Sequence, residues 1–262
     1  MQKLIYLLPC LLFGSCTHHY YMPNIHNVPL FREKNEFRIL YAQAQSDDTK
    51  SEEIQVAYSL TNHLAVLANG MKAYGGDKID GGQGEYYEGA VGYFSPINEV
   101  KYAHFEVYGG YGQGNQKHTY NKYGIGTSAL DFKQIFLQPA IGLSSKYFDA
   151  ILAFRLSKLS FTKVQNNVLK EIGTSNYNFY TLDTIAQTKN YNFGETSLTV
   201  RVGWKYAKIQ LQLNSSRNFL PQNNPYLKGY IPFEKGAISL GLQLAIAKRF
   251  WRREQKVDKK LF

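Results

Sequence analysis

Cysteine is scarce in this chain, which has only two among its 262 residues, Cys10 and Cys16. Cys10 lies in an apolar run from Leu4 to Phe13, which follows the positively charged start of the chain. A charged start, a short apolar run and a small-residue end are typical of an export signal. Removal of that signal would leave one cysteine, so the exported chain is predicted to have no internal disulfide bond.

Long apolar runs are missing as well. After the signal no stretch reaches the length of about 18 to 20 apolar residues that a transmembrane helix needs. The mean hydropathy is −0.36, whereas glycine and aromatic residues are abundant, with 22 Gly, 21 Tyr and 16 Phe. The sequence therefore predicts no membrane helix. It remains compatible with a membrane barrel, whose strands alternate lipid-facing with lumen-facing residues.

Apolar residues recur instead at every second position, which is the period of a half-buried strand. In the clearest case Ile238, Leu240 and Leu242 lie on one face, with Ser239 and Gly241 on the other. Elsewhere the opposite face carries Arg, Glu, His and Gln, which would pair inside a closed barrel while lipid covers the apolar face. We expect an all-β fold, a closed antiparallel transmembrane β-barrel of about ten strands. The expected strands are 36–45, 52–60, 63–73, 86–94, 101–112, 132–144, 147–158, 195–204, 207–214 and 236–250.

The expected connections differ in length on the two sides of the barrel. Short turns at 61–62, 95–98, 145–146 and 205–206 alternate with links that are mostly longer, namely 74–85, 113–131, 159–194 and 215–235, with only 46–51 short among them. Outer-membrane barrels have short periplasmic turns and longer outer loops. We therefore expect 159–194 to face the exterior and the tail from Arg252 to face the periplasm. Pro139 has no amide hydrogen and predicts a bulge or a local break in strand pairing.

Aromatic residues near both ends of the strands predict two interface belts. The belt at the short turns is expected to contain Tyr93, Phe94, Tyr102, Tyr147, Phe148, Trp204, Tyr206, Phe250 and Trp251. The belt at the long links is expected to contain Tyr86, Tyr87, Tyr111, Phe132, Phe161 and Phe193.

The residues around Cys16 resemble the lipobox of bacterial lipoproteins, because the small residues Gly14 and Ser15 directly precede the cysteine. In that family the signal is cut before the cysteine, whose thiol carries the lipid, so the resemblance implies a lipid on Cys16. The alternative is ordinary secretory cleavage nearby, with Cys16 as a free thiol. The expected organisation is a signal peptide at 1–15, a lipidated periplasmic linker at 16–35, an outer-membrane barrel at 36–250 and a basic periplasmic tail at 251–262.

A longer resemblance lies in the segment that follows. Residues 23–36, PNIHNVPLFREKNE, look like the opening of Bacteroidetes-type lipoproteins, in which such a segment precedes a predicted barrel. Residues 58–63 and 105–112 are similar to the same family, and the resemblance covers the N-terminal half best. It implies a lipid-anchored outer-membrane barrel. It implies no catalytic residues, because the family has no assigned activity.

The formal net charge is +10, and much of it lies in the tail from Lys248. A basic chain can indicate nucleic-acid binding, but the export signal argues against that partner, and we expect none. Six charged residues are predicted to point into the lumen: Arg38, Glu88, Glu106, Arg155, Arg201 and Lys208. Buried charges need partners, so these residues either pair and plug the lumen or line a selective pore. The plug is favoured, because the interior of a narrow barrel is filled by side chains.

A search for site chemistry finds no catalytic, cofactor or metal motif. Ten-stranded barrels include the omptin proteases, which use Asp and His on the loop side, so a loop-sited omptin-like hydrolase is a third hypothesis. Its candidates are His118 with Asp80 or Asp131 as acid–base partners. Solvated loop residues explain the same positions, and we expect no enzymatic activity and no cofactor.

The expected loops are rich in Tyr and Asn, which suit contact with proteins or sugars. In the link 159–194 the candidate contact residues are Tyr177, Phe179 and Tyr180. The leading hypothesis is a non-enzymatic outer-membrane lipoprotein barrel with a surface-interaction or envelope-structural role through its extracellular loops. Its expected partners are outer-membrane lipid and a surface protein or glycan. The alternative is a narrow pore or a small-solute binding barrel.

The lipid on Cys16 is directly testable. The mature protein purified from membranes is expected to begin at Cys16 and to carry acyl chains on that residue, because the cut precedes the cysteine. Mass spectrometry of the N-terminal peptide checks this, and the Cys16→Ser variant serves as the control without a thiol. An unmodified peptide that begins at another residue would refute the prediction.

Overall fold

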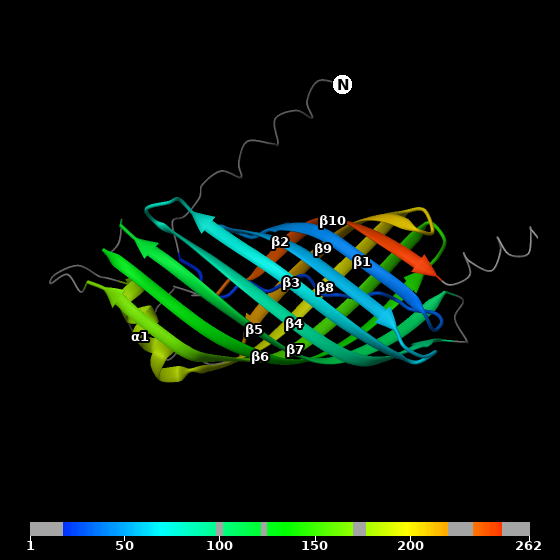
Figure 1. Ribbon diagram of the computed structural model, residues 1–262, viewed down its shortest axis with the longest axis horizontal. Coiled ribbons are helices and arrows are strands. Elements are labelled where there is room, and N and C mark those ends of the chain that lie inside the picture. The colour runs from blue at the N-terminus through cyan, green and yellow to red at the C-terminus, as the bar shows by residue number, and fades with distance from the viewer. Residues whose placement is uncertain (1–17, 98–101, 122–124, 170–176, 220–232, 248–262) are drawn as a thin grey trace, which may run out of the picture.

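The computed structural model describes residues 18–97, 102–121, 125–169, 177–219 and 233–247. Ten antiparallel strands in this part of the chain close into a barrel in chain order, with β1 paired to β10 (Figure 1). The predicted closed barrel is confirmed, and closure leaves no strand edge unpaired, as lipid requires. The strands are β1 Glu36–Gln45, β2 Thr49–Ser59, β3 Leu64–Gly76, β4 Gly81–Pro96, β5 Ala103–Tyr120, β6 Gly126–Ser144, β7 Phe148–Val168, β8 Asn190–Gly203, β9 Ala207–Asn218 and β10 Gly236–Ala247.

The two mouths of the barrel are built differently. The turn mouth carries the connections at 60–63, 97–102, 145–147 and 204–206, close to where the sequence predicted short turns. At the other end, the loop mouth, the wall varies in height, because strand length rises from 10 residues in β1 to 21 in β7. The loop mouth therefore has a low rim over β10, β1 and β2 and a high rim over β5, β6 and β7.

Three of the expected long links are wrong, because the strands continue into them. The link expected at 74–85 is a turn at 77–80, and the link expected at 113–131 is reduced to 121–125. The segment expected to be the longest loop, 159–194, holds the end of β7, the helix α1 Tyr177–Thr188 and the start of β8. Leu182 and Ile185 of α1 are buried against the barrel interior. No helix in the described ranges is long and apolar enough to cross a membrane.

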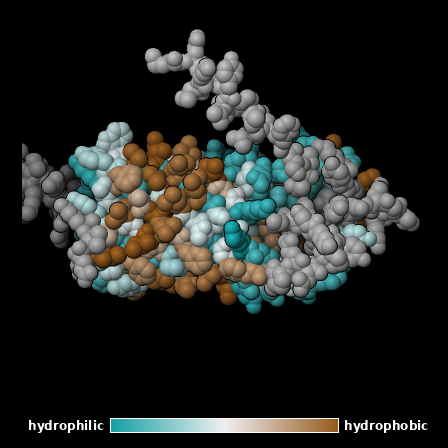
Figure 2. Space-filling view, turned by 180° about the vertical axis from the view of Figure 1, so that it is seen from behind, coloured by the Kyte–Doolittle hydropathy of each residue, from teal (hydrophilic) through white to brown (hydrophobic). Residues whose placement is uncertain are grey.

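The apolar outer surface forms a band next to the turn mouth. Leu137, Leu152, Leu198, Leu211 and Leu242 are about half exposed on five different strands. Figure 2 shows this band on one half of the barrel and a hydrophilic surface on the half toward the loop mouth. The outward residues of the hydrophilic half include Gln113, Asn115, Lys133, Lys158 and Asn192. An apolar band around a closed barrel is the surface that a bilayer covers.

The aromatic belt at the turn mouth is confirmed for its exposed members, which are Tyr93, Tyr102, Tyr147, Phe148, Trp204 and Tyr206. Phe94 is an exception, because it is fully buried. The belt expected at the loop mouth is largely wrong: Tyr87 and Tyr111 are exposed, whereas Tyr86, Phe132, Phe161 and Phe193 are buried inside the barrel. Phe250 and Trp251 lie outside the described residues. The apolar faces therefore reverse along the long strands, from outward in the band to inward near the loop mouth.

The expected irregularity at Pro139 is confirmed. On the β7 side the pairs Leu137 with Leu156 and Ala140 with Ala153 are formed, but Gln138 and Pro139 have no β7 partner between them. On the β5 side Pro139 is paired with Val107. The missing amide hydrogen of Pro139 interrupts the pairing of β6 with β7, but the register of the two strands is the same on both sides of the gap.

The band predicts a strong position dependence for charged substitutions. Leu242 lies near the middle of the apolar face of β10, between Tyr41 and Ile209, and Leu242→Arg is expected to lower the free energy of unfolding by about 2–4 kcal/mol. Asn115→Arg, on the hydrophilic half, is the matched control and should change it little. Urea titration of the protein in lipid vesicles measures both values, and equal losses would contradict the placement of the band.

Candidate functional site

The lumen is occupied by the N-terminal part of the described chain. Residues 18–31, here called the lumen segment, are all buried except the half-buried His19. The segment begins at the loop mouth, where His18 Nε2 lies 3.1 Å from the carbonyl oxygen of Thr119. It ends at the turn mouth, where the Asn35 amide donates to the carbonyl oxygen of Ser59 just before β1. The prediction that this stretch is a periplasmic linker is wrong for residues 18–31.

The composition of the lumen segment explains its burial. Residues 17–31 contain no Asp, Glu, Lys or Arg, while Tyr20, Tyr21, Ile25, Val28 and Phe31 supply large apolar surface. A solvated linker has little apolar surface and is usually rich in charged or small polar residues. Burial of this apolar surface stabilises the segment inside the barrel.

Wall side chains bond to the backbone of the upper half of the segment. Gln212 of β9 accepts from the His26 amide at 2.8 Å and donates to the His26 carbonyl oxygen at 3.1 Å. The Ile25 amide donates to both carboxylate oxygens of Glu53, at 3.0 and 3.1 Å, and Gln55 donates to the Ile25 carbonyl oxygen at 2.7 Å. The backbone N–H and C=O groups of Ile25 and His26 therefore all have partners, although the segment pairs with no strand here.

The lower half is held in the same way. Gln138 donates to the Asn27 carbonyl oxygen at 2.9 Å, and Arg201 Nη2 donates to the Val28 carbonyl oxygen at 2.8 Å. Near the turn mouth the Phe31 amide donates to Glu106 Oε1 at 2.9 Å. The polar inner wall therefore acts as a set of matched partners for one extended chain.

A charged cluster lies at mid-height. Arg155 and Glu88 are both almost completely buried, with Arg155 Nη2 at 3.2 Å from Glu88 Oε1. Asn24 joins them, because its amide donates to Glu88 at 3.0 Å and its oxygen accepts from Arg155 at 2.7 Å. Higher up, Tyr21 donates to Glu195 at 2.7 Å. Asn24 and Tyr21 of the lumen segment thus form hydrogen bonds with the buried charged side chains.

The six charges predicted to face the lumen do face it, but they do not form one network. Glu88 pairs with Arg155, and Glu106 binds the lumen segment. Lys208 Nζ and Arg201 Nη1 both approach Asp149, at 2.6 and 3.9 Å, near the turn mouth. Arg38 pairs with Glu36 and donates to the Pro29 carbonyl oxygen at 3.4 Å. The prediction that side chains alone plug the lumen is therefore corrected.

Sequence reasoning missed the acidic residues that complete these contacts. They are Glu36, Glu53, Asp149 and Glu195. Asp149 has the same alternation phase as Arg155, and Glu195 the same phase as Arg201, so period two could have found both. Their partners on the lumen segment could not be found, because the segment itself was expected outside the barrel.

The loop mouth is closed by an apolar cluster. Tyr20 and Tyr21 of the lumen segment pack there with Leu182 and Ile185 of α1 and with Phe233. Tyr21 lies 4.8 Å from the Phe193 ring, and Phe193 lies 5.3 Å from the Phe233 ring. Further members are Met71, Tyr86, Tyr120, Leu130, Phe132, Leu159, Phe161, Val168 and Tyr191. The cluster covers the polar mid-section from the loop side.

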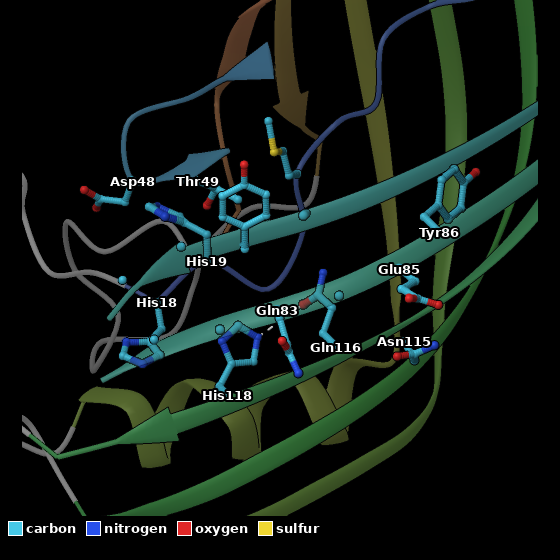
Figure 3. Close-up of a pocket in the computed structure, with 18 of the residues that line it drawn as sticks. His18, His19, Asp48, Thr49, Gln83, Glu85, Tyr86, Asn115, Gln116 and His118 are labelled. Atoms are coloured by element: carbon cyan, nitrogen blue, oxygen red, sulfur yellow. Dashed lines mark hydrogen bonds between the residues drawn. The ribbon is translucent and has the colours of Figure 1, made fainter. Parts of the chain in front are cut away.

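A cavity of about 210 Å³ remains beside this cluster. Figure 3 shows His18 and His19 of the lumen segment and His118 of β5 around it. His18 stacks on Tyr120 with ring centroids 4.4 Å apart, and its Nε2 is 4.0 Å from Asp80. Burial lowers the pKa of His18 below its ordinary value, against the opposing effect of the Thr119 carbonyl.

The geometry does not assemble the catalytic pair considered for a hydrolase. His118 is buried, with Gln116 Oε1 at 3.4 Å from its Nε2. Asp131 points outward on β6, so the pair His118–Asp131 is not formed. Asp80 accepts from the Asn121 amide at 2.9 Å and lies beside His18. Within the described ranges no group of three or more His, Cys, Asp or Glu residues could hold a metal ion.

A second cavity of about 450 Å³ opens at the turn mouth. Its lining contains Arg32, Arg38, Lys146, Lys205 and Lys208, with Glu33, Glu36 and Asp149 as the acidic members. The lumen segment separates it from the loop-mouth cavity. The two ends of the barrel therefore differ in character: aromatic and histidine-rich at the loop mouth, basic at the turn mouth.

The predicted contact residues lie at the start of α1. Tyr177 and Phe179 belong to the helix, but their side chains are outside what the structure describes. Tyr180 is half-buried, and its carbonyl oxygen accepts from Thr184 at 2.8 Å. The signal peptide at 1–15, Cys16 and the tail at 251–262 also lie outside the described residues.

No family model matches the chain, and no curated protein matches it by sequence. Among similar solved structures, the N-terminal β-barrel domain of Pseudomonas aeruginosa OprF is 6% identical over 82% of this chain and 99% of that chain, with a TM-score of 0.34. The outer membrane protease OmpT from Escherichia coli is 9% identical over 84% and 99%, with a TM-score of 0.41. The translocator domain of autotransporter NalP from Neisseria meningitidis is 8% identical over 80% and 87%, with a TM-score of 0.45. These likenesses concern barrel architecture alone.

The buried ion pair at mid-height should dominate the stability of the filled lumen. Arg155→Met leaves Glu88 charged, buried and uncompensated, and is expected to lower the free energy of unfolding by about 3–5 kcal/mol. The control is Lys72→Met, which breaks the exposed pair with Glu85 and should cost about 0–1 kcal/mol. Denaturant titration in detergent or lipid compares the two variants, and similar losses would show that the mid-height cluster is unimportant.

Proposed function

We propose that this protein is a non-enzymatic, lipid-anchored outer-membrane barrel with a sealed lumen, which acts through the surface around its loop mouth. The observation that carries the proposal is the lumen segment. Its backbone forms hydrogen bonds with the polar side chains of the inner wall along the lumen. A solute would have to displace an extended chain and break its hydrogen bonds with Gln212, Glu53 and Gln138.

Two features support an orientation with the loop mouth outside. The two longest connections, 169–189 and 219–235, both lie at the loop mouth, and longer connections are typical of the outer end of outer-membrane barrels. The hydrophilic outer wall of β5, β6 and β7 rises beyond the apolar band on the loop side only, as a wall standing in water would. In this orientation α1 and the high rim stand outside the cell.

The high rim and α1 then form the contact surface. The exposed side of α1 carries Asp183 and Gln187, and the outer wall below it carries Lys133, Lys158 and Lys163. The proposed partner is a surface protein or a glycan, with Tyr177 and Phe179 as aromatic contacts at the start of the helix, because rigid rings give contact area at low entropic cost. Outer-membrane lipid is the partner of the apolar band.

The geometry favours neither the pore nor the hydrolase. A pore needs a continuous aqueous path, and the lumen segment with the apolar cluster above it lies across that path. A hydrolase of the omptin type needs an acid–base pair open to substrate, and His118 is buried away from Asp131.

The sealed lumen gives a sharp electrical test. The intact protein in planar lipid bilayers is expected to show no resolved conductance steps, because the lumen segment fills the barrel. The comparison is a chain that lacks residues 18–31 and still migrates as a folded, heat-modifiable barrel, which is expected to conduct. Regular current steps from the intact protein would contradict the proposal and favour the pore.

A further inference from the structure

The lumen segment changes which end of the barrel the N-terminus leaves. Ten strands return the chain to its starting mouth, and Glu36 at the start of β1 is indeed paired with Ala247 at the end of β10. The lumen segment then carries the chain across to the loop mouth, where His18 contacts Thr119 and Tyr120. In Figure 1 the end of β10 lies opposite α1, which marks the loop mouth. The described ends of the chain are thus at opposite mouths.

At the loop mouth the segment contacts both rims: His18 lies against Thr119 and Tyr120 at the end of β5, whereas His19 lies toward the low rim. His19 Nδ1 lies 3.3 Å from Glu234 Oε1, just before β10. Glu234 in turn accepts from Ser46 Oγ at 2.6 Å, and Ser46 opens the turn between β1 and β2. The low rim therefore contacts His19, while the high rim contacts His18, the described residue nearest to Cys16.

The apolar band comes closest to the mouth at the low rim. Ile238 is 59% exposed on the outer face of β10 and is paired with Gln45, the neighbour of Ser46. On the high rim the last exposed large apolar residue of β5 is Tyr111, whereas the strand continues to Tyr120. The apolar band is therefore nearest to the mouth on the side that His19 contacts.

Chain length decides the leaflet. Cys16 precedes His18 by two residues, and two extended residues span at most about 7 Å. The hydrocarbon core of a bilayer is about 30 Å thick. A lipid on Cys16 therefore cannot return to the leaflet at the turn mouth, whichever way the barrel faces.

We propose that the chain is threaded through its own barrel, so that its mature N-terminus leaves at the loop mouth and the acyl chains of Cys16 insert into the leaflet on that side. In the orientation proposed above, on which this step rests together with the lipid on Cys16, that leaflet is the outer one. The lipid then locks the lumen segment, because withdrawal toward the turn mouth would drag acyl chains through a polar interior. The anchor secures the plug in a barrel that already spans the membrane.

Antibody access to three tagged full-length proteins tests the threading. One epitope is inserted directly after Cys16, one after Ile79 in the turn of the loop mouth, and one after Lys146 in the turn of the turn mouth. The tags after Cys16 and Ile79 are expected to stain intact cells, and the tag after Lys146 only permeabilised cells. If the Cys16 tag follows the Lys146 tag instead, the threading is wrong.

The same experiment separates threading from orientation. If the Ile79 tag stains only after permeabilisation, the orientation proposed above is wrong. Threading is then judged separately: it is upheld if the Cys16 tag stains under the same conditions as the Ile79 tag, and it is overturned if it does not. Should the Cys16 tag prevent assembly, Thr17→Cys replaces it and is compared with Ile79→Cys and Lys146→Cys. Labelling of intact cells with a membrane-impermeant maleimide then gives the same readout, and a Thr17→Cys protein that labels only with Lys146→Cys overturns the proposal.

Discussion

The hydrogen bonds between wall side chains and the backbone of the lumen segment are the interaction on which the rest of the structure depends. An extended chain in a space closed to bulk water needs a partner for every amide and carbonyl group. Gln212, Gln55 and Gln138 supply such partners together with the carboxylate of Glu53 and the guanidinium of Arg201. This explains why the inner wall is rich in side-chain amides as well as in charges: one side-chain amide can accept from the N–H and donate to the C=O of one residue, as Gln212 does at His26.

The reversal of the apolar faces follows from the two solvents around the wall. Within the band the outer face of β7 meets lipid, so Leu152, Phe154 and Leu156 point outward and Arg155 points inward. Above the band the outer face meets water, and Leu159 and Phe161 point inward to the apolar cluster. A strand that leaves the bilayer without ending must exchange its polar and apolar faces, since the lumen at that level is closed by aromatic side chains.

This reversal marks how far the sequence could predict the fold. The strands and the turns beside the band follow from period two, because lipid imposes one apolar face there. The outer strand ends do not follow from this pattern, because Tyr191 and Phe193 point inward although lipid would require apolar residues to point outward. The alternation of residues along the strands was enough to predict which charged side chains point inward. Their partners were not predicted, because contacts such as that of Glu88 with Asn24 join residues far apart in the chain. The uncharged composition of residues 17–31 was a local signal of burial.

The filled lumen also constrains where this protein can meet anything else. The carboxylate of Glu88 contacts Asn24, Tyr86 and Arg155, and Gln138 contacts Asn27 and Arg155. A solute-binding interior needs such groups directed into open space, whereas here the lumen segment and its neighbours already occupy them. Breaking one contact leaves a buried polar group without its partner, and that loss exceeds the gain from a typical new hydrogen bond. This is why the proposed function places contact with a partner at the mouths and on the hydrophilic wall beyond the apolar band.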